Sequence, residues 1–258
     1  DVLGFALSNV MFKGNEEELK QTKITQPAIF LHSIAELTVL KETYSPSAVA
    51  GHSLGEFSSL VANNTISFED GLKLVFLRAK AMQKSCENSD GTMAAILGLD
   101  DKIIKDTCES FDGNVIAANF NCPGQVVISG ELNAVKKICE KFNEIGARRS
   151  ILFPVGGAFH SNLMNDAKSE LKEAIHNTKF NNPTCPIYQN FTAQKTTSVD
   201  IIKENLINQL TAPVLWTQTI NNMVNDGYLN YTEVGPGKVL QGLIRKVNRE
   251  VSTESALG

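Results

Sequence analysis

The sequence lacks several features that would place it in large classes of protein. No apolar run approaches the roughly 18 residues of a membrane-spanning helix, so we expect no membrane segment. Lys and Arg number 24 against 28 Asp and Glu, a net charge of −4, which argues against nucleic acid or an anionic membrane as the main partner. The five cysteines form no C-x-x-C pair or metal-like cluster, and no secretory signal is visible. These absences favour reduced thiols and a cytoplasmic location.

One short motif points to nucleophilic chemistry. Gly51-His52-Ser53-Leu54-Gly55 reads G-x-S-x-G and lies between a predicted strand at 47–50 and a predicted helix that starts at Glu56. Strand, tight turn and helix are the context of a nucleophile elbow. Ser53 is therefore a candidate nucleophile, and the amide of Leu54 at the helix start is placed to stabilise an oxyanion. The alternative is that the motif occurs here by chance.

A serine nucleophile needs a base, and the chain has only four histidines. His52 lies inside the motif, where its ring should point to the other side of the turn from Ser53. His32 lies in an apolar helix-like run and His176 on a predicted solvated helix face. His160 follows a predicted strand end and glycine turn at 155–159, the kind of loop on which α/β proteins carry chemistry. We therefore expect His160 to be the base, with a structural histidine as the alternative.

The usual third member of a catalytic triad has no clear candidate. In α/β-hydrolases the chain order is serine, acid, histidine. The acidic residues between Ser53 and His160 lie mostly on predicted helices and loops of an inserted module. A backbone carbonyl can hold the Nδ1–H of a histidine equally well, because that position needs only an acceptor.

The predicted elements describe an α/β fold in two parts. Strands at 92–99, 114–118, 125–129 and 148–153, with helices at 101–111 and 132–145, follow the β-α-β-β-α-β order of a ferredoxin-like module. Strands and helices alternate outside it, which implies a mostly parallel sheet covered on both faces. We expect a large α/β-hydrolase-like domain, residues 1–90 and 155–258, and an inserted ferredoxin-like subdomain, residues 91–154.

Several motifs together resemble the malonyl-CoA:acyl carrier protein transacylases, a family that includes the enzyme of bacterial fatty acid synthesis and the acyltransferase domains of polyketide synthases. The resemblance covers essentially the whole chain. It rests on Arg78 and on the stretches 26–28 (QPA), 51–58 (GHSLGEFS), 119–127 (NFNCPGQVV), 157–161 (GAFHS), 209–214 (QLTAPV) and 233–240 (EVGPGKVL).

The resemblance implies a role for each matching residue. Ser53 would carry the malonyl ester, and His160 would act as general base and then general acid. The backbone carbonyl of Gln209 would orient His160 in place of a carboxylate, and Leu54 would give one oxyanion amide. Arg78 would pair with the free malonyl carboxylate, a partner that a guanidinium binds bidentately. From spacing alone, Arg78 could equally be a surface arginine on a helix.

Further residues would shape the substrate site. Phe159 resembles the residue that favours malonyl over branched acyl groups. Asn119 and Asn121 resemble asparagines that line the cleft, although they could also be ordinary turn residues. His52 and Met82 complete the expected substrate-binding set.

The implied function is transfer of malonyl from malonyl-CoA to the phosphopantetheine thiol of an acyl carrier protein, without a metal or nicotinamide cofactor, in a monomer. Polyketide-type acyl transfer, serine thioesterase activity and a non-catalytic carrier-binding role are the alternatives. One family feature has no counterpart in the sequence: an N-terminal glycine-glutamine motif whose glutamine amide completes the oxyanion hole. We expect that motif, with a first strand and helix, upstream of residue 1.

Overall fold

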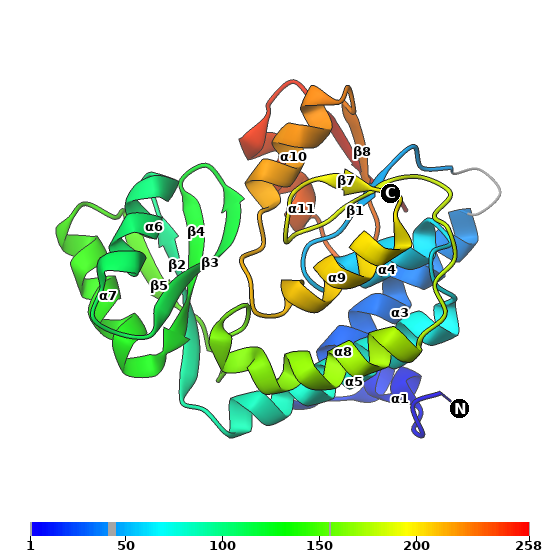
Figure 1. The fold of residues 1–258 in the computed structure, drawn as a ribbon, viewed down its shortest axis with the longest axis horizontal. Helices are drawn as coiled ribbons and strands as arrows, with labels where there is room; N and C mark the ends of the chain where they lie inside the picture. Colours follow the sequence, from blue (N-terminus) through cyan, green and yellow to red (C-terminus); the bar gives the residue numbers. More distant parts are fainter. Residues whose placement is uncertain (1, 41–44, 155, 258) are drawn as a thin grey trace.

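The structure, a computed structural model, describes residues 2–40, 45–154 and 156–257 and has two parts (Figure 1). The smaller part, drawn in green at the left of Figure 1, is built on one four-stranded sheet. The larger part contains the remaining helices and two short sheets. Val155, which was predicted to end a strand, lies outside the described residues. No helix within the described ranges is long and apolar enough to cross a membrane.

The smaller part has the predicted β-α-β-β-α-β order. Its elements are β2 (Gly91–Leu97), α6 (Asp101–Ser110), β3 (Val115–Cys122), β4 (Gln125–Glu131), α7 (Leu132–Glu144) and β5 (Arg149–Leu152). The strands lie in the order β3-β4-β2-β5, and all neighbours are antiparallel. Alternate residues of β2 face opposite sides, as a strand requires: Ala94 and Ile96 pack with α6 and α7, whereas Met93 and Ala95 join a separate apolar cluster.

The strand β3 is longer than the sequence pattern predicted. The prediction ended at Ala118, but β3 continues to Cys122. Its second half pairs with β4 and also with a segment of the larger part: Phe120 N donates to Val214 O over 2.9 Å, and Val214 N donates to Ala118 O over 2.8 Å. This added partner is remote in sequence, so local periodicity could not reveal it. Asn119 and Asn121 therefore lie on a strand and are not turn residues.

The larger part carries its strands in two short sheets. β1 (Val49–Ala50) pairs in parallel with β6 (Ile187–Tyr188), which pairs antiparallel with β7 (Lys195–Thr196). β8 (Asn230–Glu233) pairs in parallel with β9 (Ser252–Ser255). A cavity of about 950 Å³ is lined by residues of β1 and β8, by the turns that follow them, and by side chains from α3 and α11. The expected mostly parallel sheet is thus divided within the described residues.

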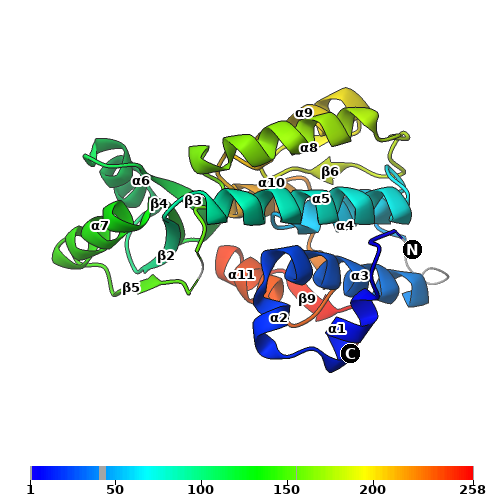
Figure 2. The ribbon, with the colours of Figure 1, turned by 90° about the horizontal axis from the view of Figure 1, so that it is seen from below.

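Helices surround these sheets. They are α1 (Leu7–Lys13), α2 (Glu16–Lys20), α3 (Thr22–Leu40), α4 (Gly55–Ala62), α5 (Phe68–Glu87), the 3-10 turn η1 (Asn162–Met164), α8 (Asn165–Asn177), α9 (Val199–Gln209), α10 (Trp216–Asn225) and α11 (Val239–Val247). Figure 2 shows α5 running between α3 on one side and α8 with α9 on the other.

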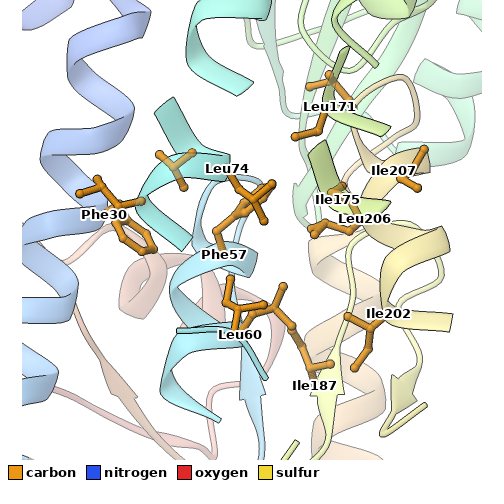
Figure 3. Close-up of a cluster of buried hydrophobic side chains, with 14 of the residues drawn as sticks. Phe30, Phe57, Leu60, Leu74, Leu171, Ile175, Ile187, Ile202, Leu206 and Ile207 are labelled. Atoms are coloured by element: carbon orange, nitrogen blue, oxygen red, sulfur yellow. The ribbon is translucent and has the colours of Figure 1, made fainter. Parts of the chain in front are cut away.

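The main apolar core fixes the helix that follows the G-x-S-x-G turn. In Figure 3, Phe57 and Leu60 of α4 lie between Phe30 of α3 and side chains of α8, α9 and β6. Phe57 and Leu60 are completely buried. Burial of such side chains contributes roughly 1.5–3 kcal/mol each, so α4, and with it the start of the helix beside Ser53, is held firmly.

Candidate active site

Ser53 lies on a sharp turn between β1 and α4, the predicted strand–turn–helix arrangement. Its φ of 51° is in the left-handed region, which is unusual for a residue other than glycine. The backbone of Gly51 passes so close to Gly55 that a Cβ on Gly51 would lie 2.0 Å from the Gly55 carbonyl carbon. Only glycine fits there. The amide of Ser53 donates to Asn190 Oδ1 over 2.6 Å, which holds the turn from the neighbouring strand's end.

His160 reaches the serine from the loop between β5 and η1, also with a left-handed φ of 60°. Its Nε2 lies 2.8 Å from Ser53 Oγ, and its Nδ1 lies 2.9 Å from the main-chain carbonyl oxygen of Gln209. A carbonyl can only accept, so Nδ1 carries the proton and the Nε2 lone pair faces the serine hydroxyl. The histidine is thus oriented by a carbonyl.

The electrostatic surroundings of His160 keep its ring neutral. Burial lowers the pKa of His160 to about 3, and the nearby charge of Arg78 acts in the same direction. A neutral imidazole can accept a proton from Ser53 at neutral pH. The residue is only 3% exposed, so its ring lies in a site with little bulk water.

Arg78 comes from the middle of α5, and its guanidinium is buried beside the serine. The side chain is 1% exposed, which rules out the surface arginine that the spacing also allowed. Nη2 donates to Ser53 Oγ over 2.9 Å and to Gln209 Oε1 over 3.2 Å, and Nη1 donates to Gln26 Oε1 over 2.6 Å. Burial lowers the pKa of Arg78 to about 10, so the group stays charged at neutral pH. Its Nε–H has no hydrogen-bond partner among the described residues.

Glu56 and Asn190 were not predicted as site residues, yet Asn190 contacts Ser53 and Glu56 contacts Gln209. Glu56 is completely buried, and burial raises its pKa to about 8. Its two oxygens accept hydrogen bonds from Asn190 N over 2.7 Å and from the side-chain amide of Gln209. One available signal was spacing: Glu56 and Leu60 are four apart in a helix, so they share a face. For Asn190, the signal was its place just after the strand β6.

Leu54 and Phe159 lie next to the reacting pair in the chain. Leu54 is the residue before α4, and its backbone is helical, so its amide belongs to the helix N-terminus. Phe159 is half-buried and packs against both the main core and the apolar cluster on the inner face of the four-stranded sheet. It therefore stands where the two parts of the molecule meet.

The other predicted substrate residues contact neighbouring elements, and no hydrogen bond to Ser53 or His160 is recorded for them within the part of the chain that the structure describes. His52 Nε2 lies 2.8 Å from Asn121 Oδ1, and the His52 ring centroid is 5.6 Å from that of Trp216. This pairing gives the ring partners on β3 and α10. Asn119 is buried on β3 beside Val214. Met82 is buried in the main core, and its Sδ accepts a hydrogen bond from Gln26, the partner of Arg78.

The residues that the structure brings together are thus Ser53, His160, Arg78 and Gln209, with Glu56 and Asn190 behind them. Among residues 2–40, 45–154 and 156–257, no three His, Cys, Asp or Glu side chains are grouped so that they could hold a metal ion.

Known proteins are similar to this chain in sequence and in fold. The family described as "Acyl transferase domain" matches residues 1–258. The malonyl CoA-acyl carrier protein transacylase of Bacillus subtilis (strain 168) is 41% identical over 257 residues, covering 98% of this chain and 81% of that protein. Its counterpart in Staphylococcus aureus (strain MRSA252) is 39% identical over 258 residues, covering 99% and 83%.

Solved structures of similar transferases have the same fold as this chain. An acyl carrier protein S-malonyltransferase from Vibrio cholerae O1 superposes with a TM-score of 0.94 at 38% identity, covering 98% of this chain and 84% of that one. A malonyl-transacylase in complex with its type II polyketide acyl carrier protein superposes with a TM-score of 0.95 at 37% identity, covering 99% and 84%.

Proposed function

We infer that this chain, which belongs to the acyl transferase family, transfers malonyl from malonyl-CoA to an acyl carrier protein, as the names of its relatives indicate. From this premise we propose that the malonyl group passes through an ester on Ser53, with His160 moving the proton. The 2.8 Å contact between Ser53 Oγ and His160 Nε2 supports these roles.

In the first half-reaction, His160 Nε2 takes the proton of Ser53 Oγ as Oγ attacks the thioester carbonyl. The amide of Leu54 stabilises the oxyanion at the helix N-terminus. The carbon–sulfur bond then breaks, and the CoA thiolate leaves with the proton from His160. The Gln209 carbonyl holds Nδ1–H throughout, so it stabilises the imidazolium that forms between the two proton transfers.

In the second half-reaction the same groups work in reverse. The phosphopantetheine thiol of the carrier protein gives its proton to His160, and its sulfur attacks the malonyl ester. The bond from Ser53 Oγ to the acyl carbon breaks, and Oγ recovers the proton. The cycle therefore needs no net proton uptake by the site.

One observation carries the proposal that the acyl group is malonyl: the buried guanidinium of Arg78 lies at the nucleophile itself. A buried cation is costly unless it is paired, and its Nη2 and unpartnered Nε–H are suited to a carboxylate. The bound malonyl carboxylate would exchange with the present contacts of Arg78. A thioesterase that transfers acyl groups to water would have little use for this cation, and hydrolysis is therefore the weaker alternative.

A second oxyanion donor is part of the proposal. The resemblance implies a glutamine amide from an N-terminal glycine-glutamine motif, and Leu54 and Gly55 both line the cavity between β1 and β8. A segment seated in that cavity would bring a donor close to the Leu54 amide. Removal of one such donor typically slows acyl transfer by about 10²–10³-fold.

Pathway, location and assembly are the remaining parts of the proposal. We assign the chain to fatty acid synthesis, with polyketide synthesis as the alternative, and expect it to act as a monomer. All five cysteines are unpaired thiols, which fits a reducing cytoplasmic compartment.

The test is the intact mass of the protein after brief exposure to malonyl-CoA. A malonyl adduct that is absent in Ser53→Ala and that an added phosphopantetheinylated carrier protein removes would support the proposal. Steady CoA release without an adduct would indicate hydrolysis and contradict it.

Arg78→Ala tests the assignment of the acyl group. Acylation by malonyl-CoA should fall by about 10²-fold or more, because the malonyl carboxylate loses its buried partner, while acylation by acetyl-CoA should fall much less. Arg245→Ala, on the exposed face of α11, is the matched control. An unchanged preference for malonyl over acetyl would contradict the role given to Arg78.

A further inference from the structure

Glu56 is the one completely buried carboxylate recorded among the described residues, and the mechanism above does not use it. Oε1 accepts from the amide of Asn190 over 2.7 Å, and Oε2 accepts from the side-chain amide of Gln209. Burial of a carboxylate costs free energy unless hydrogen bonds compensate for it. The two residues that donate to Glu56 therefore indicate what role it has.

Asn190 connects Glu56 to the nucleophile. Its side-chain Oδ1 accepts from Ser53 N over 2.6 Å, and its Nδ2 donates to Gly51 O over 2.7 Å. These two bonds clamp both ends of the strained turn that holds Ser53 at a φ of 51°. Glu56 in turn fixes the backbone of Asn190.

Gln209 connects Glu56 to the base. Its side-chain amide contacts Glu56 and also donates to Ser53 O over 2.9 Å, while its main-chain oxygen accepts from His160 Nδ1. Arg78 donates to Gln209 Oε1, which leaves the amide nitrogen facing Glu56. The orientation of the Gln209 side chain is therefore determined from both sides.

We propose that Glu56 is a positioning residue that fixes Ser53 through Asn190 and His160 through Gln209, so that one buried carboxylate sets the distance between nucleophile and base. The proposal rests on the seryl-ester mechanism for its effect on rate. It does not depend on that mechanism for its effect on geometry. A displacement of about 1 Å at reacting atoms can slow a reaction about 10²-fold.

The experiment compares Glu56→Met and Glu56→Gln with the parent chain. Methionine has a similar volume and removes both acceptors, whereas glutamine offers one oxygen in place of two. Glu204→Gln, exposed on the same helix as Gln209, is the control. Measurements are made at pH 8.5, above the pKa of about 8 that burial gives Glu56, so that the parent carboxyl is mostly ionised and both of its oxygens accept.

The first readout is the rate of Ser53 acylation by malonyl-CoA, followed by intact mass at several substrate concentrations. We expect a fall of about 10–100-fold in the maximal rate for Glu56→Met, a smaller fall for Glu56→Gln, and no change for Glu204→Gln. The half-saturating malonyl-CoA concentration should change less than the rate, because Glu56 is completely buried and its hydrogen bonds go to Asn190 and Gln209.

The second readout is independent of acyl transfer. The Nδ1–H proton of His160, followed by NMR with ¹⁵N-labelled histidine, should shift and exchange faster with water in Glu56→Met, because its acceptor has moved. Should that variant fail to fold, Glu56→Gln carries the test with the same readouts. A folded variant with parental acylation, or one with an unchanged His160 resonance, would overturn the proposal. Absence of malonyl ester in the parent chain would instead contradict the proposed function, and the resonance would still decide the role of Glu56.

Discussion

The four-stranded subdomain and the catalytic site bury opposite kinds of side chain. The subdomain core consists of apolar residues from neighbouring elements, such as Ile96, Ile138 and Phe142, and the order of its elements follows from periodicity alone. The site buries Glu56, Arg78 and His160. Its hydrogen bonds join residues far apart in sequence: Ser53 and His160 are separated by 107 positions, and Ser53 and Gln209 by 156. The subdomain is specified by local sequence pattern, whereas the site is specified by tertiary assembly. Substitutions should therefore be able to abolish acylation without unfolding the chain, and to lower its stability without abolishing acylation.

The substitution His160→Ala should give the largest difference between the effect on acylation and the effect on stability. Without a base, acylation of Ser53 should slow by about 10²–10⁴-fold, while the fold remains, because the apolar cores do not include this side chain. The measurement is the rate of malonyl adduct formation together with a urea melt. His176→Ala, on the exposed face of α8, is the control and should leave both unchanged. Parental acylation in His160→Ala would remove it as the base.

The converse change is Phe142→Ala in the subdomain core. Phe142 is completely buried on α7, so its truncation should lower the free energy of unfolding by about 3–5 kcal/mol. Molecules that remain folded should still acylate Ser53 at nearly the parental rate. Phe12→Ala, at a side chain that is 82% exposed, should cost little stability. A large loss of acylation in the folded fraction would show that the two regions are not separable.

The same contrast explains what could be predicted from sequence. The subdomain elements matched their predicted ranges closely because each depends on a short pattern, and the exception, the end of β3, is where the strand meets Val214 of the larger part. Ser53 stood out because its turn needs glycine at Gly51. The burial of Arg78 did not follow from its helix, since one position at the edge of an apolar stripe can face core or solvent.

Glu56 and Asn190 show the limit more sharply. A glutamate on a helix is ordinarily exposed, and an asparagine after a strand is ordinarily a turn residue. Glu56 is buried here because Asn190 N and the Gln209 side chain donate to its carboxylate. Asn190 is buried because its own groups bond Glu56, Ser53 N and Gly51 O. Hydrogen bonds among three segments that are far apart in sequence cannot be predicted from the local sequence pattern of any one of them.

Phe159→Ala sharpens the comparison at the place where the two regions meet. Phe159 packs against both apolar clusters, so a smaller side chain should make room for an α-methyl group on the acyl chain. The preference for malonyl-CoA over methylmalonyl-CoA should weaken by about 1–3 kcal/mol, the usual worth of one such group. Competition between the two thioesters, read by adduct mass, measures it. A preference equal to that of the parent would exclude Phe159 as the selective residue.

The smallest effect concerns pH, and it arises from the polar site alone. The pKa of Glu56 rises from its ordinary 4.5 to about 8 in the folded protein. Between these values the folded state therefore holds a proton that the unfolded state has lost, and stability falls as pH rises, by up to about 1.4 kcal/mol per pH unit. The pKa of His160 is lowered instead, so its contribution is complete above 6.5 and is lost as pH falls towards about 3.

Between pH 7.5 and 8.5 the contribution of Glu56 can be separated from those of His160 and His52. The pKa values of both histidines are lowered by burial, and in the unfolded chain their ordinary value is 6.5, so both rings are almost entirely neutral in both states there, whereas the folded Glu56 still titrates. Urea melts across this interval should show stability falling with pH in the parent chain and falling less in Glu56→Gln, which cannot titrate. Glu204→Gln should follow the parent, since that side chain is exposed in both states. Parallel curves for the parent and Glu56→Gln would mean that the Glu56 carboxyl titrates alike in the folded and unfolded chains, and the pH dependence would then have to come from outside the site.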